Sequence, residues 1–561
     1  MRPALLKLWL LIVAVALFIN LGAYPLYDAD EGRNGEVGRE MAATNDYVMP
    51  RIDGMPYLDK PIVYFAAESM CMEVLGPTEL AARMPALLFT YFTAALLFWF
   101  ARRVWGEDEA LVAAIAYLAM PLTLAFSRTV IFDSALSFFM VLSTIAFYFA
   151  VEDRRPRLSG GELDRRGRLS STGWSALAWA SIALGVLTKG PVAIAVPLLI
   201  AIPYAIKREA SRVLWPRALW SWAALVLFIA IIRKASRSLR SWIGLVLFVA
   251  IIAPWVWAVT RVVPDFLHYV LVTETVQRLA TKALKRTGPP WYFIPFVIGG
   301  ALPWCIPAAM SLRRARREDA TFFAALWVLM PFLFFSISQS KRPQYILPVM
   351  PAIALLAARY WTTDERGARI ASRVAAIIFL LLGALLLAAP HVHIKMDPDT
   401  AAGAKAAAIP MAIGTLLGAF AFIKRRDLAL IAMSIPIITI PLTAKPLLDA
   451  IGARRSAKSF VAQLPASSKY VAIEDYTGSI QFYLGKPIDV VTPDAEEFTS
   501  NYIIRHYDQF ANDARWPVKR TLTLEHGVVY IVRNNDAAHR AMLEKNGFSL
   551  IATGAHHVAY R

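Results

Sequence analysis

Hydrophobic residues gather in long runs over most of the chain, and polar residues gather in the stretches between them. A helix of about 20 apolar residues crosses the hydrocarbon core of a bilayer. The runs predict thirteen helices, at 8–21, 81–100, 109–127, 133–151, 173–188, 191–206, 241–260, 291–311, 320–338, 345–361, 374–389, 406–423 and 428–445. Residues 1–448 are therefore predicted to form an α-helical integral membrane domain with about 13 transmembrane helices.

The pattern changes after Leu448, where hydrophobicity falls and shorter segments replace the long runs. Alternation of apolar and polar residues is typical of strands, whereas a period of 3.6 residues is typical of helices. We predict strands at 470–474 and 488–492, a hairpin of 521–525 with 528–533, and helices at 496–510 and 536–545. Residues 454–561 are thus predicted to form a soluble α/β domain. It carries no cluster typical of catalysis, so a capping or docking role is the simplest interpretation.

Composition and charge support a membrane protein. Of the 561 residues, 57% are hydrophobic and 18% are charged, which excludes a disordered chain and a purely soluble enzyme. A net charge of +18 would suggest nucleic acid in a soluble protein. Here the basic residues collect in alternate loops, as expected of cytoplasmic loops, so we expect no nucleic-acid partner. The predicted cytoplasmic loops are Arg102–Arg103, 152–172, 207–240, 312–319, 362–373 and 424–427.

This alternation also predicts the topology. The basic start with Arg2 and Lys7, and the absence of a cleavage site after the first run, predict an uncleaved helix with a cytoplasmic N-terminus. Thirteen crossings then place the C-terminal domain in the periplasm. One segment departs from the pattern, because 221–232 and 241–252 match at nine of twelve positions. The first copy is too short to cross the bilayer, so we predict that it lies at the cytoplasmic interface.

The predicted periplasmic loop at 22–80 is unusually long for a connection. The spacing of charged and apolar residues at 36–41 favours a short helix along the membrane surface, and 62–75 favours a second one. Eight acidic and four basic residues occupy 22–60. This loop is therefore predicted to be structured by juxtamembrane helices.

Carboxylates recur in this loop beside basic residues. Asp30 and Glu31 come where the first helix leaves the bilayer, and Asp59 precedes Lys60 later in the loop. A carboxylate at this position often marks only the outer end of a helix. The repetition of acid and base favours a functional site over that interpretation.

Asp133 lies between two predicted spans, with apolar residues on both sides. A carboxylate at the edge of a bilayer is costly, and it is a candidate functional residue for that reason. The alternative is a structural pair with Arg128, five residues earlier. Lys189 ends another span on the same predicted side, next to a Gly-Pro turn that explains the helix end but not the lysine.

A third group of charges follows the run at 320–338. Lys341 and Arg342 lie on the predicted outer side, against the positive-inside trend, and Tyr345 begins the next helix. Misplaced positive charge near a membrane surface is typical of a site for an anion such as a lipid phosphate. The tyrosine hydroxyl is a candidate donor to the same anion, or an ordinary interfacial aromatic.

These groups together indicate group transfer from a lipid-linked phosphate. Carboxylates would steer or activate the nucleophile, and lysines and arginines would stabilise the phosphate leaving group. The sequence shows no Gly-rich nucleotide loop and no Walker motif. A transporter is the alternative from another class, but transporters favour repeated halves and mid-membrane charges, and the repeat here is twelve residues long.

At these residues the chain resembles the GT-C glycosyltransferases related to protein O-mannosyltransferases, and among them the bacterial transferases that add aminoarabinose to lipid A. The resemblance covers nearly the whole chain. It is strongest in Asp30-Glu31-Gly32-Arg33, Tyr57-Leu58-Asp59-Lys60-Pro61 and Lys341-Arg342-Pro343-Gln344-Tyr345-Ile346-Leu347-Pro348. The acid before Lys-Pro is usually Glu in this family and is Asp59 here.

The resemblance implies an inverting enzyme of a Gram-negative inner membrane, with its active site facing the periplasm. Its donor would be 4-amino-4-deoxy-L-arabinose on undecaprenyl phosphate, and its acceptor would be a lipid A phosphate, which gives resistance to polymyxin and other cationic peptides. A different sugar, or a protein or glycan acceptor, is the alternative within the superfamily. We expect a monomer whose further partners are membrane lipids.

The resemblance also implies roles for individual residues. Asp30 would be the main catalytic carboxylate and Asp133 the second, whereas the donor phosphate would bind Lys60, Tyr57, Tyr345, Lys341 and Arg342. Glu31, Asp59 and Lys189 are candidate supporting residues. We expect no required cofactor, and Asp59 with His268 is the candidate pair for a divalent metal, if the two loops meet.

Overall fold

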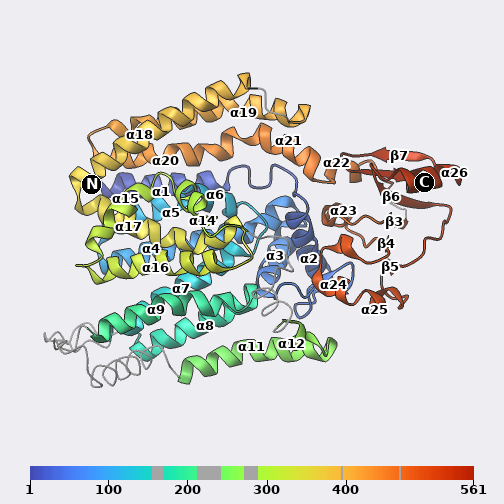
Figure 1. The fold of residues 1–561 in the computed structure, drawn as a ribbon, viewed down its shortest axis with the longest axis horizontal. Coiled ribbons are helices and arrows are strands. Elements are labelled where there is room, and N and C mark those ends of the chain that lie inside the picture. Colours follow the sequence, from blue (N-terminus) through green and yellow to red (C-terminus); the bar gives the residue numbers. More distant parts are fainter. Residues whose placement is uncertain (154–168, 211–241, 271–287, 393–395, 466–468) are drawn as a thin grey trace.

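The computed structural model describes residues 1–153, 169–210, 242–270, 288–392, 396–465 and 469–561. These residues form a bundle of long helices followed by a smaller domain built on a sheet (Figure 1). The predicted interfacial segment at 221–232 lies outside the described residues.

The helices of the bundle follow the hydrophobic runs, and each of the thirteen predicted runs falls on a helix or on consecutive helices. They are α1 (Pro3–Phe18), α4 (Glu79–Val104), α5 (Glu107–Leu118), α6 (Pro121–Ser127), α7 (Asp133–Glu152), α8 (Ser171–Lys189), α9 (Val192–Ala210), α11 (Trp242–Val262), α14 (Phe293–Gly300), α15 (Cys305–Ser311), η3 (Leu312–Arg314), α16 (Asp319–Ile337), η4 (Pro343–Val349), α17 (Met350–Thr363), α18 (Glu365–Ala388), η5 (Ala389–His391), α19 (Pro398–Leu417), η6 (Gly418–Phe422) and α20 (Arg426–Thr443).

The predicted fold class is confirmed, and the chain is a multi-pass membrane protein. In the described ranges, eight helices are long and apolar enough to cross a membrane, and the bent pairs α5–α6 and α14–α15 would raise that number to ten. The first pair bends by 64° where Pro121 begins α6, because proline starts a helix readily but cannot continue one. The full count of thirteen crossings stays a prediction, since α1 has only 16 residues and α8 and α9 are not among the ten.

Ion pairs join the loops that the charge pattern assigns to the cytoplasm. These pairs are Lys7–Glu107, Arg359–Glu109, Arg359–Glu318, Arg208–Glu152, Arg208–Asp319 and Arg314–Asp364. The N-terminus lies at one end of the long axis, and the C-terminal domain lies at the other (Figure 1). Loops of one predicted side therefore meet at one end of the bundle, which agrees with the predicted alternation.

The loop at 22–80 is structured, as predicted. It contains α2 (Asp30–Thr44), the short strands β1 (Arg51–Ile52) and β2 (Met55–Pro56), and α3 (Val63–Leu75). The helices α2 and α3 lie between the bundle and the C-terminal domain (Figure 1). A further short helix, α12 (Phe266–His268), follows α11. Because α2 begins at Asp30, the predicted catalytic carboxylate lies on its first turn.

The chain leaves the bundle through α21 (Lys445–Arg455) and α22 (Lys458–Val461) and enters an α/β domain. Its six-stranded sheet has the order β5-β4-β3-β6-β8-β7. The strands are β3 (Lys469–Ile473), β4 (Asp489–Val491), β5 (Val518–Lys519), β6 (Val528–Arg533), β7 (Leu550–Thr553) and β8 (His557–Tyr560), and the helices are α23 (Gly478–Leu484), η7 (Glu496–Phe498), α24 (Asn501–Arg505), α25 (Tyr507–Ala511) and α26 (Ala537–Lys545).

Two details of this domain differ from the sequence prediction. The predicted hairpin of 521–525 with 528–533 is wrong, because β6 pairs in parallel with β3 and antiparallel with β8. The five residues Val528–Val532 are all buried, so this strand needs a neighbour on each side. The predicted helix at 496–510 is divided into η7, α24 and α25, because Thr499 adopts a left-handed φ of 51° and Ser500 then caps α24.

Short contacts fix the C-terminal domain on the first outer loop. Ser479 at the start of α23 donates from its backbone N–H to Asp28 (3.1 Å), and its hydroxyl donates to the same carboxylate. The buried Asp53 accepts from the backbone N–H of Ile488 at 3.1 Å. A Cβ on Gly478 would lie 2.5 Å from the backbone of Arg33. The C-terminal domain therefore packs directly against α2, the helix that begins with Asp30.

Candidate active site

A cavity of about 100 Å³ lies where the outer ends of the helices meet the C-terminal domain. Charged side chains from separate parts of the chain face it. Its charged lining consists of Asp30 and Arg33 of α2, Asp59 and Lys60 of the following loop, Asp133 of α7, Lys189 of α8 and Arg342 before η4. The remaining lining is Asn34, Tyr57, Ile131, Phe132, Gln344, Tyr345, Thr499 and Asn501. The structure thus brings together most of the residues that the sequence singled out.

Asp30 lies between two arginines. Arg33 donates to one carboxylate oxygen at 2.8 Å, and Arg342 donates to the other at 3.1 Å. The side chain is still 41% exposed, so it can reach a ligand in the cavity. Arg33 also donates to Thr499 of the C-terminal domain at 2.7 Å. Burial would lower the pKa of Arg33, but the neighbouring Tyr57 and Asp30 outweigh it and raise that pKa. Arg33 is therefore a permanent cation.

Asp133 is almost completely buried and pairs with Lys189 at 2.5 Å. The alternative pairing with Arg128 does not occur, because Arg128 donates to the backbone oxygen of Leu17. The Lys189 ammonium also lies 4.8 Å from the centre of the Tyr345 ring, a cation–π distance. Lys189 therefore links the second predicted carboxylate to the predicted donor-binding tyrosine.

Tyr57, Asp59 and Lys60 form one wall of the cavity. Within the described residues, the Asp59 carboxylate accepts four hydrogen bonds, and all of them come from distant parts of the chain. The donors are the hydroxyls of Tyr269 (2.7 Å) and Ser500 (3.3 Å) and the backbone N–H groups of Asn501 (3.1 Å) and Tyr502 (3.3 Å). Asp59 therefore binds the C-terminal domain to the loop that carries Lys60. The Lys60 ammonium donates to the backbone carbonyl of Asp59 at 2.5 Å.

Three predicted site residues do not line the cavity: Glu31, Lys341 and His268. Glu31 is buried and binds Arg83 through both of its oxygens, at 3.0 and 2.8 Å. Its carboxylate also accepts from the backbone of Tyr27 and Val130, each at 3.0 Å. Glu31 and Asp30 are adjacent on a helix, so their side chains point about 100° apart. Glu31 thus joins elements of the fold, and it does not share the cavity with Asp30.

Lys341 likewise faces away. Its ammonium donates to the backbone carbonyls of Ser336 and Ser338, each at 2.7 Å. These carbonyls belong to the end of α16, where helix carbonyls lack partners and attract cations. The predicted contact of Lys341 with donor phosphate is therefore not supported by its position, whereas Arg342 does face the cavity.

The predicted metal pair gains no support from the geometry. His268 does not line the cavity, and the Asp59 carboxylate is occupied by the four donors described above. In the described ranges, the group of three or more possible ligands that lie close enough for one metal is Glu474, Asp536 and His539. It belongs to the C-terminal domain beside α26. A metal at Asp59 and His268 stays a prediction.

Sequence reasoning missed five polar residues of the cavity: Arg33, Asn34, Gln344, Thr499 and Asn501. Arg33 could have been found, because residues three positions apart share a helix face and Asp30 starts the helix. Asn34 donates to the carbonyl of Val130 at 2.9 Å and holds α2 near Asp133. Thr499 and Asn501 lie more than 400 positions from Asp30, and no local pattern points to them.

Comparison with known proteins gives this geometry a context. Residues 59–160 match the model of the family described as dolichyl-phosphate-mannose-protein mannosyltransferase. The undecaprenyl phosphate-α-4-amino-4-deoxy-L-arabinose arabinosyl transferase of Yersinia enterocolitica is 29% identical over 359 residues, which cover 63% of this chain and 58% of that protein. The arabinosyl transferase 2 of Sodalis glossinidius is 32% identical over 381 residues, which cover 67% of this chain and 62% of that protein.

Solved structures agree over a longer range. ArnT from Cupriavidus metallidurans, crystallised with undecaprenyl phosphate, superposes with a TM-score of 0.79 at 23% identity and covers 100% of this chain and 98% of that one. This chain is a relative of the arabinosyl transferases and has their GT-C fold. It spans about three-fifths of the length of the curated relatives it matches. The predicted resemblance and the predicted fold class are thereby confirmed.

Proposed function

We propose that the chain is a glycosyltransferase that moves 4-amino-4-deoxy-L-arabinose from undecaprenyl phosphate to a lipid A phosphate. The observation that carries the proposal is the cavity at the outer end of the bundle, where Asp30 and Asp133 lie among Arg33, Lys60, Lys189 and Arg342. Such a mixture suits a reaction that binds one phosphate, releases another and handles a cationic sugar amine. The arabinosyl transferases named above use the corresponding donor, according to their names.

The reaction would be a single in-line displacement. A phosphate oxygen of the acceptor forms a bond to the anomeric carbon of the sugar, and the bond from that carbon to the undecaprenyl phosphate oxygen breaks. Negative charge develops on the leaving phosphate. Lys60 and Arg342, which both line the cavity, would stabilise it, with the Tyr345 hydroxyl as a further donor. No covalent bond between sugar and protein is required.

Asp30 would act by position. The acceptor phosphate is already ionised near neutral pH, so it needs no general base. The carboxylate holds Arg33 and Arg342 in place at 2.8 and 3.1 Å and remains 41% exposed toward the cavity. It would therefore orient the sugar amine and keep both arginines aimed at the phosphates. Asp133 would do the same for Lys189.

The proposed location is the inner membrane of a Gram-negative bacterium, with the cavity facing the periplasm. The supporting observation is that the strongly basic loops share the end of the bundle opposite to the cavity. A monomer without a required cofactor is part of the proposal. Modification of lipid A would lower its negative charge and protect cells from polymyxin.

The test is mass spectrometry of lipid A from cells that carry the wild type or Asp30→Asn. The wild type should add an aminopentose, and Asp30→Asn should reduce that addition about 10²–10³-fold, the range for loss of one preorganised electrostatic group. The matched control is Asp449→Asn on α21, which removes a partly exposed carboxylate that pairs with Lys445 away from the cavity. No added sugar in the wild type would contradict the acceptor, and normal modification by Asp30→Asn would contradict the assigned site.

A further inference from the structure

A second and larger cavity, of about 580 Å³, lies between the end of α21 and the edge of the α/β sheet. Its size is within the usual range for small-molecule sites. None of its lining residues except Asp28 belongs to the membrane domain before α21. It shares no residue with the cavity around Asp30, so it is a separate site.

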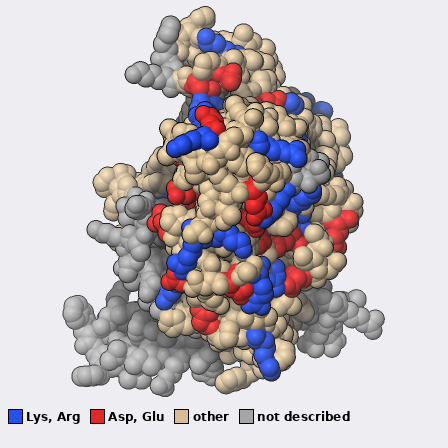
Figure 2. All heavy atoms as spheres, turned by 90° about the vertical axis from the view of Figure 1, so that its right-hand side faces the viewer, with Lys and Arg blue, Asp and Glu red and all other residues tan. Residues whose placement is uncertain are grey.

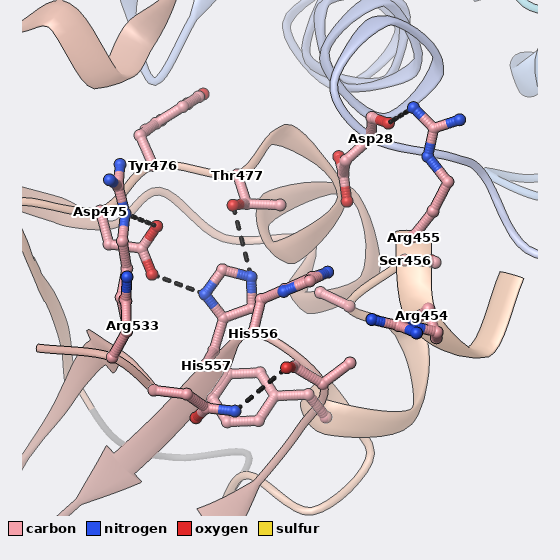
Figure 3. A pocket seen from close by; sticks show the side chains of 15 residues that line it. Asp28, Arg454, Arg455, Ser456, Asp475, Tyr476, Thr477, Arg533, His556 and His557 are labelled. Carbon is pink, nitrogen blue, oxygen red and sulfur yellow. Dashed lines mark hydrogen bonds and ion pairs between the residues drawn. The ribbon is translucent and has the colours of Figure 1, made fainter. Parts of the chain in front are cut away.

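Arginines enter this cavity from two sides. Figure 3 shows Arg454 and Arg455 on one side, Arg533 on the other, and His557 between them. Arg454 and Arg455 end α21, whereas Arg533 ends β6. Cationic donors thus converge from a bundle extension and from the sheet, although the two elements are far apart in the sequence.

The position of His557 is fixed by hydrogen bonds. Its Nδ1 lies 2.5 Å from the buried Asp475, and its Nε2 lies 3.4 Å from the hydroxyl of Thr477 (Figure 3). Asp475 also accepts from Nε of Arg533 at 3.4 Å. One buried carboxylate therefore orients both the imidazole and the guanidinium, which is the arrangement of a preformed binding site.

The two acids of the lining are already occupied. Arg454 pairs with Asp397 at 2.6 Å, whereas Arg455 and Arg533 keep donors for a ligand. Asp475 binds His557 and Arg533, and Asp28 accepts from Ser479. In the part of the chain that the structure describes, Arg455 forms no ion pair, and its one side-chain hydrogen bond is a 3.4 Å contact to the Asp28 carbonyl. Among the described residues, Arg533 pairs through Nε alone, and its side chain is 50% exposed. Their terminal amino groups are therefore available to an anion.

We propose that this cavity binds a phosphate monoester carried on a sugar. Guanidinium forks bind phosphate in pairs of hydrogen bonds, and arginine donors that approach from two sides suit the several oxygens of a phosphate. The volume leaves room for the ring that bears the phosphate. The face of the molecule at its C-terminal end carries lysine and arginine beside aspartate and glutamate (Figure 2), so the preference for an anion comes from the cavity itself.

The site also has a direct connection to the first cavity. The backbone N–H of Asp28 donates to the carbonyl of Arg455 at 2.7 Å. Asp28 is two residues from Asp30, so a ligand held by Arg455 would lie beside the segment that starts α2. The sugar phosphate could be part of a membrane lipid or a soluble molecule, and the experiment separates these sources.

The test measures binding to the full-length protein in nanodiscs by calorimetry. The probes are inorganic phosphate, glucosamine 1-phosphate and lipid A, and the proteins are the wild type and Arg455→Gln/Arg533→Gln. Each lost charge-assisted contact typically weakens binding about tenfold or more. We expect at least a tenfold rise in Kd for glucosamine 1-phosphate in the double variant. Arg515→Gln, which alters an arginine that is 80% exposed and outside both cavities, should leave the Kd unchanged.

Each outcome is informative. A loss confined to glucosamine 1-phosphate supports a soluble ligand, and a loss confined to lipid A supports a lipid headgroup. Equal affinity of wild type and double variant for all three probes, or no binding of any of them, would overturn the proposal. Asp30→Asn should retain glucosamine 1-phosphate binding, so this site can stand even if the proposed transfer reaction fails.

Discussion

Among the individual residues, Asp133 and Lys189 form a pair whose role is either chemical or structural. Both side chains are largely buried, with exposures of 3% and 14%, and a buried pair can serve either chemistry or structure. Removal of one partner leaves an uncompensated charge, whereas removal of both does not. The two roles therefore differ in how single and double variants behave.

We expect Lys189→Met to lower stability by about 3–5 kcal/mol, as for other broken buried pairs. Asp133→Asn/Lys189→Met should recover most of the lost thermal stability in detergent but should not recover sugar transfer, because the cavity has lost both charges. Recovery of transfer together with stability would show that the pair is only structural.

Glu68 on α3 is the clearest source of pH-dependent stability. It is fully buried, and in the described ranges neither of its carboxyl oxygens has a hydrogen-bond partner. Burial raises the pKa of Glu68 well above its usual range, and the nearby Glu31 raises it further. In the unfolded chain the pKa of this glutamate is about 4.3, so the proton is released at a lower pH than in the folded chain. The carboxyl group therefore destabilises the folded state increasingly as the pH rises above the unfolded value.

We expect Glu68→Gln to raise the Tm at pH 8, because the amide has no charge to desolvate. The gain should shrink at pH 5, since each pH unit is worth about 1.4 kcal/mol over the range in which the two states differ in protonation. Glu73→Gln, on the exposed side of the same helix, is the control and should show no such trend. A gain that is equal at both pH values would contradict the buried, protonated carboxyl group.

Among the helices, the contact of α23 with α2 determines the position of Asp30. Gly478 begins α23 directly against the backbone of Arg33, where an added Cβ would lie only 2.5 Å from backbone atoms. Backbone cannot swing aside as a flexible side chain can. A methyl group here must therefore push the two helices apart, and overpacking of this kind typically costs about 1–3 kcal/mol.

We expect Gly478→Ala to lower sugar transfer at least tenfold while the protein still inserts into the membrane, because a shift of α2 moves both Asp30 and Arg33. Gly299→Ala is the matched control, since a Cβ added there would meet no atom within 4 Å. Transfer measured in membranes with equal protein amounts compares them. Full transfer by Gly478→Ala would mean that the docked domain does not control the site.

For the molecule as a whole, the topology follows from which loops meet at which end. Arg208 belongs to the end with the ion pairs among basic loops, and Ala453 lies on α21 next to the C-terminal domain. Fusions of a reporter at these two positions should report opposite sides of the membrane, with Arg208 in the cytoplasm. The same side for both would overturn the predicted number of crossings.

The class of the protein and most of the charged residues that line the candidate cavity could be predicted from the amino-acid sequence. In lipid, the backbone N–H and C=O groups of a long apolar run must form hydrogen bonds within their own segment. Such a run is therefore predicted to be a membrane helix. Motif residues such as Asp30, Lys60 and Arg342 were found because charges at membrane boundaries are costly and stand out. The two juxtamembrane helices followed from local spacing.

Which of these charges share a cavity could be seen only in three dimensions. Lys341 donates to helix carbonyls and Glu31 binds Arg83, although each is adjacent in sequence to a residue that faces the cavity. Thr499 and Asn501 entered the cavity from the far end of the chain, and β6 paired with β3 and β8 instead of the nearby 521–525. Local sequence governs which face of an element a residue occupies, but a partner hundreds of residues away is selected by long-range packing.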